Sequence, residues 1–241
     1  DVRRLRDSVD GFLVGTLLMR AADPDRAARR LVFGPTKVCG LTRPEDAAAA
    51  ARAGATHGGI IFAPESPRAV TTARAVDLVR AAPLAWVGVF ADQPADYVAR
   101  TAATLGLEAI QLHGDESDDY GAQLRSLLPP ECAIWRARRV AGDPIAEPSG
   151  PVDAILLDAY APGRRGGTGR TFDWSLLDSI AAPERFILSG GLSPDNVGRA
   201  NCTPIEFLDV NSGVESAPGI KDRDRLARFF TGRRAPSGDV S

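Results

Sequence analysis

Residues 36–62 have the sequence TKVCGLTRPEDAAAAARAGATHGGIIF, and this stretch decides the fold. Two short, largely apolar runs at 37–39 and 57–62 are typical of buried strands. Between them, residues 44–53 are predicted to form a helix, because proline stands at the start and Gly54 directly follows the end. A strand, a helix and a second strand in so short a stretch indicate two parallel strands joined by a crossover helix.

The same alternation continues along the rest of the chain. It predicts eight short, apolar strands, at residues 37–39, 57–62, 86–90, 109–112, 133–136, 154–158, 186–188 and 207–210. The clearest helices are predicted at 44–53, 72–82, 94–105, 194–199 and 222–231, whereas 141–151 holds too much proline and glycine for one. Eight such modules predict an α/β fold, the (β/α)8 TIM barrel, over residues 36–233 with a flexible tail at 234–241. A doubly wound open sheet is the alternative.

The first 35 residues add one βα unit more than an eight-stranded barrel needs. Residues 11–14 form an apolar run that predicts a strand, and Gly15 and Thr16 follow it. Residues 23–33 predict an amphipathic helix that leads into a turn at Gly34 and Pro35. This unit is interpreted either as the end of an upstream barrel with its linker or as a helical extension packed on the outside of the predicted barrel.

Composition favours a small-molecule partner. The chain has 29 basic and 31 acidic residues and a net charge of −2, so no overall positive field favours nucleic acid or an anionic membrane. Three distant cysteines without a C-x-x-C pair, and only two histidines, predict a reducing compartment and no metal. With no signal segment or membrane span predicted, we expect a cytoplasmic protein. The sequence starts with aspartate instead of methionine, which suggests a fragment or a processed chain.

Two strand ends carry groups suited to acid–base chemistry, because TIM barrels place reactive side chains at the C-terminal ends of their strands. Cys39 ends the first strand, where it is either a small buried residue or a base, if neighbours lower the pKa of its thiol. Asp158 ends the sixth strand, where it either caps a turn or serves as an acid whose pKa is raised by burial. Cys132 and Cys202 lack such a position and are interpreted as structural.

Two loops predict a phosphate site. Gly190 and Gly191 follow the seventh strand, and Ser212 and Gly213 follow the eighth. Loops at these two places often bind phosphate through backbone N–H groups in TIM barrels. Glycine allows the backbone to come close to an anion, and serine adds a hydroxyl donor.

Three further side chains are candidates for the pocket. Arg68, after the second strand, suits a planar carboxylate, or it is a solvated loop charge. His113 is a pocket hydrogen-bond partner, a proton carrier or a structural residue, and Asp209 either orients pocket groups or closes its strand. The glycine-rich residues 163–169 suggest a mobile lid. No nucleophilic triad can be assembled, because a G-x-S-x-G motif is absent.

The sequence resembles phosphoribosylanthranilate isomerase from about residue 37 to residue 230. The motifs that carry this resemblance occur in barrel order: KVCGL at 37–41, GIIF at 59–62, SPR at 66–68, VGVF at 87–90, QLHG at 111–114, LLD at 156–158, GGTG at 166–169, FDW at 172–174, SGGL at 189–192, DVNSGVE at 209–215 and PGIKD at 218–222. The resemblance implies an Amadori rearrangement in tryptophan biosynthesis, without a cofactor, that converts N-(5′-phosphoribosyl)anthranilate to the 1-deoxyribulose 5-phosphate.

The resemblance also implies roles for the candidate residues. Asp158 is expected to protonate the ribose ring oxygen, and Cys39 to remove the C2′ proton. Arg68 is expected to bind the anthranilate carboxylate, and His113 to lie at the substrate. The loops with Gly190, Gly191, Ser212 and Gly213 are expected to bind the phosphate.

Residues 1–35 resemble the last βα module of indole-3-glycerol-phosphate synthase, which in some organisms is fused upstream of the isomerase. The expected partners are therefore a phosphosugar substrate and such a synthase barrel, fused or in contact. An isomerase for the histidine-pathway aminoaldose, or for both substrates, is an alternative, although the resemblance implies aspartate instead of Cys39 there. A partner-docking barrel domain is the second alternative, because an isolated βα unit exposes an apolar face.

Overall fold

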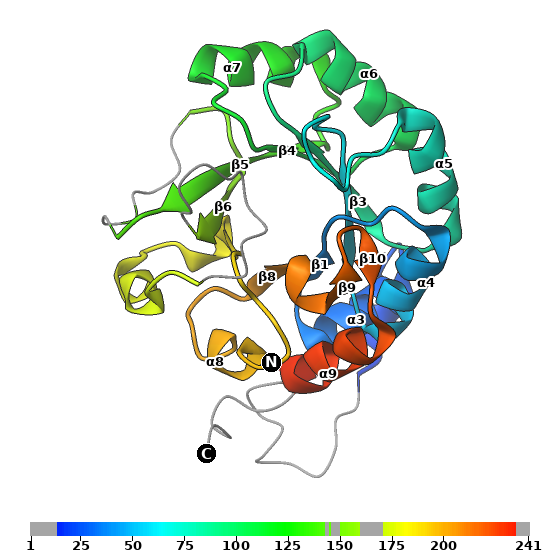
Figure 1. The fold of residues 1–241 in the computed structure, drawn as a ribbon, viewed down its shortest axis with the longest axis vertical. Coiled ribbons are helices and arrows are strands. Elements are labelled where there is room, and N and C mark those ends of the chain that lie inside the picture. Colours follow the sequence, from blue (N-terminus) through cyan, green and yellow to red (C-terminus); the bar gives the residue numbers. More distant parts are fainter. Residues whose placement is uncertain (1–13, 143–144, 146–149, 160–170, 235–241) are drawn as a thin grey trace.

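In the computed structural model, residues 14–142, 145, 150–159 and 171–234 are described. Eight parallel strands pair in sequence order and close into a barrel, which confirms the predicted fold (Figure 1). The strands are β1 Thr36–Val38, β2 His57–Ile61, β3 Ala85–Phe90, β4 Ala109–Leu112, β5 Ala133–Val140, β6 Ala154–Ala159, β7 Phe186–Leu188 and β8 Phe207–Val210. The barrel closes where β1 pairs with β8, with Lys37 opposite Asp209.

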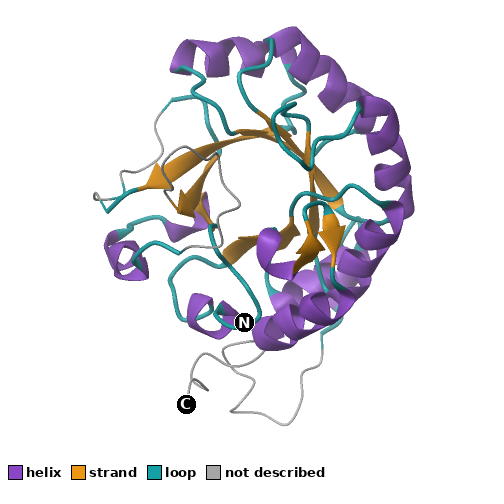
Figure 2. Cartoon of the chain, viewed as in Figure 1, coloured by secondary structure: helices purple, strands orange, loops and turns teal. Residues whose placement is uncertain are grey.

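Helices surround the ring of strands (Figure 2). They are α4 Pro44–Ala53, α5 Thr72–Ala81, α6 Ala95–Leu105, α7 Asp118–Leu127, α8 Val197–Ala200 and α9 Arg223–Arg234, with 3-10 segments η2 Trp174–Ser179 and η3 Pro183–Arg185 after β6. Side chains alternate across each strand, so one set packs against the helices and the other fills the barrel. The inner set includes a buried cluster of Val87, Ala109, Trp135, Leu156 and Ile187. Among the described helices, none has the length and apolarity needed to cross a bilayer.

Several predicted boundaries were wrong, including the end of the helix predicted at 222–231, which continues to Arg234. Strand β5 does not end at residue 136, because its pairing with β6 continues to Val140 opposite Ala159, through a stretch in which several arginines hide the apolar pattern. The helix predicted at 194–199 begins only at Val197. Its first residues form a turn in which the Asn196 side chain accepts a hydrogen bond from the Ser193 backbone N–H at 2.8 Å, a local alternative to helix. The described part of 141–151 contains no helix, as predicted.

Helix α3, Pro24–Phe33, lies against the barrel. The Asp23 side chain caps its start by accepting from the Arg26 backbone N–H at 2.8 Å, and proline occupies its first turn. Its last residue, Phe33, meets Phe230 of α9 edge-on, with ring centroids 5.6 Å apart. Arg26 pairs with Glu108, which precedes β4. This packing is what the extension interpretation expects, whereas the strand predicted at 11–14 lies largely outside the described residues.

Removal of residues 1–34 is therefore expected to lower the free energy of unfolding by on the order of a few kcal/mol, because partly buried Leu31, Val32 and Phe33 lose their contacts. The kcat of the shortened chain should stay near that of the full chain, because Arg26 and Arg29 contact residues just before β4 and β3, at the end of the barrel opposite the strand C-termini. Thermal melts and steady-state assays of both chains test this. An unchanged melting midpoint would contradict it.

Candidate functional site

Cys39 lies directly after β1, inside the barrel, and is 4% exposed. Its backbone N–H donates to the Val210 carbonyl at 2.9 Å, which holds it beside the end of β8. Gly59 of β2 makes room for it: a Cβ at residue 59 would lie 2.7 Å from Cys39 Sγ and 2.8 Å from Lys37 Cε. The absence of a side chain at Gly59 thus allows the thiol and the lysine to share the interior of the barrel.

The electrostatic surroundings of Cys39 act in two directions. Burial raises the pKa of the thiol above its ordinary value, and the nearby Asp209 carboxylate raises it further. The ammonium groups of Lys37 and Lys221 lower the pKa, but they do not cancel the effect of burial. The thiol is therefore protonated near neutral pH, and its rare thiolate form is a strong base.

Asp158 lies in β6 and is 6% exposed. Burial, assisted by the charge of Asp209, raises the pKa of its carboxyl to about 6. One oxygen, Oδ1, accepts a hydrogen bond from the Ala159 backbone N–H at 2.9 Å. The other, Oδ2, lies 3.7 Å from Nε2 of His113. A carboxyl in this state can hold a proton near neutral pH and donate it.

A row of polar side chains crosses the barrel between these two groups. Lys37 is fully buried, and its Nζ lies 3.1 Å from Asp209 Oδ2 and donates to Gln111 Oε1 at 2.6 Å. Burial lowers the pKa of Lys37, but Asp209 and its other acidic neighbours raise it overall, so the ammonium stays charged. Gln111 Nε2 in turn lies 3.0 Å from His113 Nδ1. The row joins β1 and β8 to β4 and reaches Asp158 through His113.

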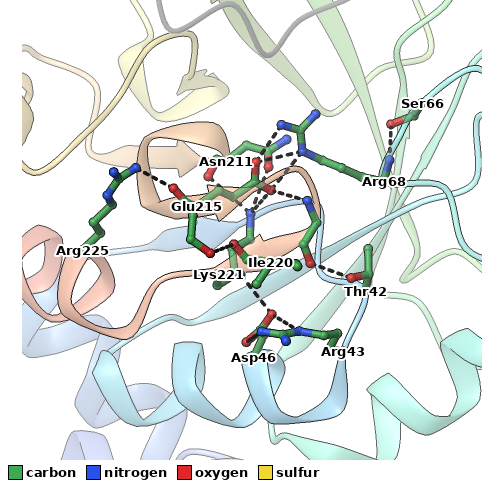
Figure 3. A network of polar contacts seen from close by, with 12 residues as sticks. Thr42, Arg43, Asp46, Ser66, Arg68, Asn211, Glu215, Ile220, Lys221 and Arg225 are labelled. Atoms are coloured by element: carbon green, nitrogen blue, oxygen red, sulfur yellow. Dashed lines mark hydrogen bonds and ion pairs between the residues drawn. The ribbon is translucent and has the colours of Figure 1, made fainter.

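Arg68 is paired with a buried carboxylate. Its Nε and Nη2 donate to Glu215 at 2.9 and 2.7 Å, and its side chain is only 12% exposed, so the interpretation as a solvated loop charge was wrong. Glu215 belongs to a short hairpin after β8, formed by β9 Glu215–Ala217 and β10 Ile220–Lys221. Figure 3 shows Arg68 and Lys221 both directed at Glu215, and Lys221 Nζ lies 2.9 Å from Glu215 Oε1.

This pairing leaves a defined edge of Arg68 for a ligand. A guanidinium can bind a carboxylate through its Nε and Nη2 or through its two Nη atoms. Glu215 occupies the first edge, which leaves the terminal edge for a second carboxylate. The arginine side chain also packs directly against Gly40, next to Cys39. A Cβ at Gly40 would lie only 2.7 Å from Arg68 Cδ.

The two predicted phosphate loops have the close backbone packing that requires glycine. Gly190 has a φ of +82°, and a Cβ there would lie 2.4 Å from the Ala159 backbone nitrogen. A Cβ at Gly213 would lie 2.0 Å from the Leu192 carbonyl oxygen, so the loops after β7 and β8 touch each other. Lys221 Nζ donates to Asn211 Oδ1 at 3.0 Å, immediately before Ser212. The hairpin that holds Arg68 thus also holds one phosphate loop.

The structure brings the predicted acid, base, arginine and phosphate loops to the C-terminal end of the barrel. Gln111, Glu215 and Lys221 stand within the motifs that carry the family resemblance, but the sequence predicts no role for them. Their chemistry depends on partners brought together by the fold, and only a polar or charged side chain inside an apolar stretch, such as Gln111 in β4, could have drawn attention to them. The lid predicted at 163–169 lies outside the described residues. Cys132 is buried before β5, at the other end of the barrel, and Cys202 is exposed after α8.

Comparisons with known proteins agree with this arrangement. Residues 36–232 match the family model described as N-(5′-phosphoribosyl)anthranilate (PRA) isomerase. The tryptophan biosynthesis protein TrpCF of Yersinia pestis is 47% identical over 234 residues, which are 97% of this chain and 48% of that protein. The N-(5′-phosphoribosyl)anthranilate isomerase of Magnetococcus marinus is 42% identical over 213 residues, which are 84% of this chain and 96% of that protein. The chain thus spans about half the length of the TrpCF relatives it matches.

Solved structures of phosphoribosyl anthranilate isomerases have a similar fold. The crystal structure of phosphoribosyl anthranilate isomerase from Thermus thermophilus superposes with a TM-score of 0.72 at 32% identity, covering 82% of this chain and 97% of that one. A phosphoribosyl anthranilate isomerase in complex with reduced 1-(o-carboxyphenylamino)-1-deoxyribulose 5-phosphate has a TM-score of 0.66 at 28% identity, covering 83% and 98%.

Proposed function

The chain belongs to the family of N-(5′-phosphoribosyl)anthranilate isomerases, and from this premise we propose that it rearranges N-(5′-phosphoribosyl)anthranilate to 1-(2-carboxyphenylamino)-1-deoxyribulose 5-phosphate. The observation that carries the proposal is a buried carboxyl with a pKa raised to about 6, Asp158, in the same barrel interior as the thiol of Cys39. An aldose-to-ketose rearrangement needs one group that donates a proton and another that removes one.

The first step uses Asp158 as the general acid. Its carboxyl proton goes to the ribose ring oxygen while the bond between that oxygen and C1′ breaks. The electron pair of the substrate nitrogen forms the new C=N bond, giving an iminium ion and leaving Asp158 as a carboxylate. Because the substrate nitrogen supplies the electrons, this step needs no cofactor.

The second step uses Cys39 as the general base. The thiolate removes the proton from C2′, and the electrons of that C–H bond return to the nitrogen through the iminium, which gives an enolamine. The enol then becomes the ketone when C1′ gains a proton and the C2′ hydroxyl loses one, with no net change in the number of protons. Lys37 and Lys221 favour the thiolate electrostatically, which supports this role of Cys39.

Binding at both ends of the substrate orients the reacting carbon atoms. We assign the anthranilate carboxylate to the terminal edge of Arg68, the edge that Glu215 leaves open. We assign the phosphate to backbone N–H groups of the loops with Gly190, Gly191, Ser212 and Gly213. His113, beside Asp158, is placed at the reacting end.

Glu215→Gln is expected to raise KM for the anthranilate substrate by about tenfold, with kcat changed by less than about threefold. The amide can accept only one of the two hydrogen bonds from Arg68, so the guanidinium loses its fixed orientation. Steady-state kinetics measure the effect. Ser216→Ala is the matched control. Ser216 lies in the same strand, but it is exposed, and its hydroxyl donates to the carbonyl of Ile220. A fall in kcat at unchanged KM would contradict a binding role.

The partner and the cellular location are further parts of the proposal. The TrpCF relatives are about twice as long as this chain, which supports fusion to, or contact with, a synthase barrel placed upstream of the isomerase. Residues 1–35 would then be the end of that barrel and its linker, with α3 packed on the outside of the isomerase barrel as well. A biosynthetic reaction on a phosphorylated intermediate supports a location in the cytoplasm.

One assay tests the proposed function. Fluorescence of the anthranilate group is followed as phosphoribosylanthranilate is consumed, beside a parallel reaction with the histidine-pathway aminoaldose. Turnover of the first substrate alone is expected. Turnover of the aminoaldose alone would show that the reaction class is right and the substrate wrong, and the absence of both would overturn the proposal.

A further inference from the structure

We propose that Lys37 and Gln111 fix the tautomer of His113, so that its Nε2–H faces Asp158 and stabilises the carboxylate left after proton donation. This inference rests on the proposed function, because it assigns a purpose to a contact with the general acid. It makes Lys37, Gln111 and His113 positioning residues that act through Asp158.

The first step is the orientation of the Gln111 amide. Lys37 Nζ lies 2.6 Å from the Gln111 side chain, and an ammonium can only donate hydrogen bonds. The amide oxygen of Gln111 must therefore face Lys37, since the opposite orientation would put two donors in contact. Lys37 is itself held by Asp209 at 3.1 Å and is fully buried, so it has no freedom to turn away.

The second step is the protonation of the imidazole. With its oxygen facing Lys37, Gln111 presents its NH2 group to Nδ1 of His113 at 3.0 Å. An NH2 group only donates, so Nδ1 must accept and carries no proton. The neutral ring then has its proton on Nε2. An imidazolium would put an N–H against the amide NH2, so this row disfavours the interpretation of His113 as a proton carrier.

The third step is the contact with Asp158. Nε2 lies 3.7 Å from Asp158 Oδ2, while Oδ1 already accepts from the Ala159 backbone N–H. Catalytic hydrogen bonds are often long without substrate and shorten in the reacting complex. When Asp158 gives up its proton, a negative charge forms in a buried site that also contains Asp209. The N–H of His113 then donates to that charge, as the Ala159 N–H does from the other side.

The tautomer can be read directly by 15N NMR of the imidazole nitrogens. The chain has only two histidines, so the His113→Asn variant identifies the signals of His113 by difference. Near neutral pH, without substrate, the signals of His113 are expected to show a protonated Nε2 and an unprotonated Nδ1. A protonated Nδ1, alone or together with a protonated Nε2, would overturn the inference, whatever the enzyme's activity.

Two substitutions of Gln111 then test the function of the row. Gln111→Glu keeps an acceptor for Lys37 but presents a second acceptor to His113, so the proton is expected to move to Nδ1 and kcat to fall by about tenfold or more, with KM changed by less than threefold. Gln111→Met has a similar length and no hydrogen bonds, so it should leave a mixture of tautomers and an intermediate kcat. A changed NMR signal with unchanged kcat would overturn the functional part.

Failure of this inference can be separated from failure of the proposed function. If the wild-type chain turns over phosphoribosylanthranilate while Gln111→Glu is as active, the isomerase assignment stands and the role of the row is wrong. If the wild-type chain turns over neither tested substrate, the proposed function fails, while the NMR signals still report on the tautomer. Thermal melts of each variant show whether a fall in kcat comes from unfolding.

Discussion

Cys39→Ser is expected to lower kcat by a factor of about 10² to 10⁴, which is the usual contribution of a general base. A serine hydroxyl has nearly the same size as the thiol but a far higher pKa, so no base forms near neutral pH. The buried position next to Gly59 should accept serine without a rearrangement, because the side chain becomes slightly smaller. Steady-state kinetics with phosphoribosylanthranilate measure the effect.

The chain offers a matched control for this substitution. Cys202→Ser makes the same chemical change at an exposed cysteine after α8, and it should leave kcat and KM unchanged. Thermal melts should show that both variants fold. If Cys39→Ser kept a kcat within a factor of about three of the wild type, another group would have to remove the C2′ proton.

The sequence points to the proposed acid and base more directly than to the side chains around them. Cys39 and Asp158 could be proposed from the sequence because each ends an apolar strand, where a barrel exposes its side chains. Gln111 and Lys37 are 74 residues apart in the chain, and Arg68 and Glu215 are 147 apart. Such pairs form only when the barrel closes in a particular strand register. No local pattern of residues predicts that register.

The fold shows the same division between local and long-range information. Eight strands could be predicted because each has a short, largely apolar run. The length of β5 could not be predicted in this way. Its last residues include charged arginines and stay in the strand because they pair with β6. Likewise, Glu215 occupies one edge of Arg68, and only the structure shows which edge remains for a ligand.

Asp158→Asn is the second substitution with a large expected effect. The amide keeps the shape of the side chain but cannot donate a proton as a carboxylic acid does, so kcat should fall by about 10² to 10⁴ while KM changes little. Steady-state kinetics test this. An increase in KM at unchanged kcat would instead make Asp158 a binding residue.

The pH profile gives an independent test of the same residue. The proposed mechanism requires Asp158 protonated and Cys39 deprotonated, yet the pKa of Asp158, about 6, is lower than that of Cys39. Between the two pKa values, each rise in pH forms thiolate and removes the acid equally, so kcat/KM stays level. Below about pH 6 the carboxyl of Asp158 is already fully protonated. A further fall in pH then only removes thiolate, so kcat/KM falls. This break near pH 6 should disappear in Asp158→Asn.

The stability of Asp158→Asn should change in the opposite direction to its activity. The carboxyl of Asp158 has a pKa of about 6 in the folded protein, above its ordinary value of 3.8, so the folded state loses stability as pH rises from about 4 to 6. The difference corresponds to about 3 kcal/mol at neutral pH. Asparagine has no charge to bury, so we expect about 1–3 kcal/mol of added stability at pH 7 and none at pH 3. Urea unfolding at both pH values measures this, and a variant less stable than the wild type at pH 7 would show that Asp158 is not held as a buried acid.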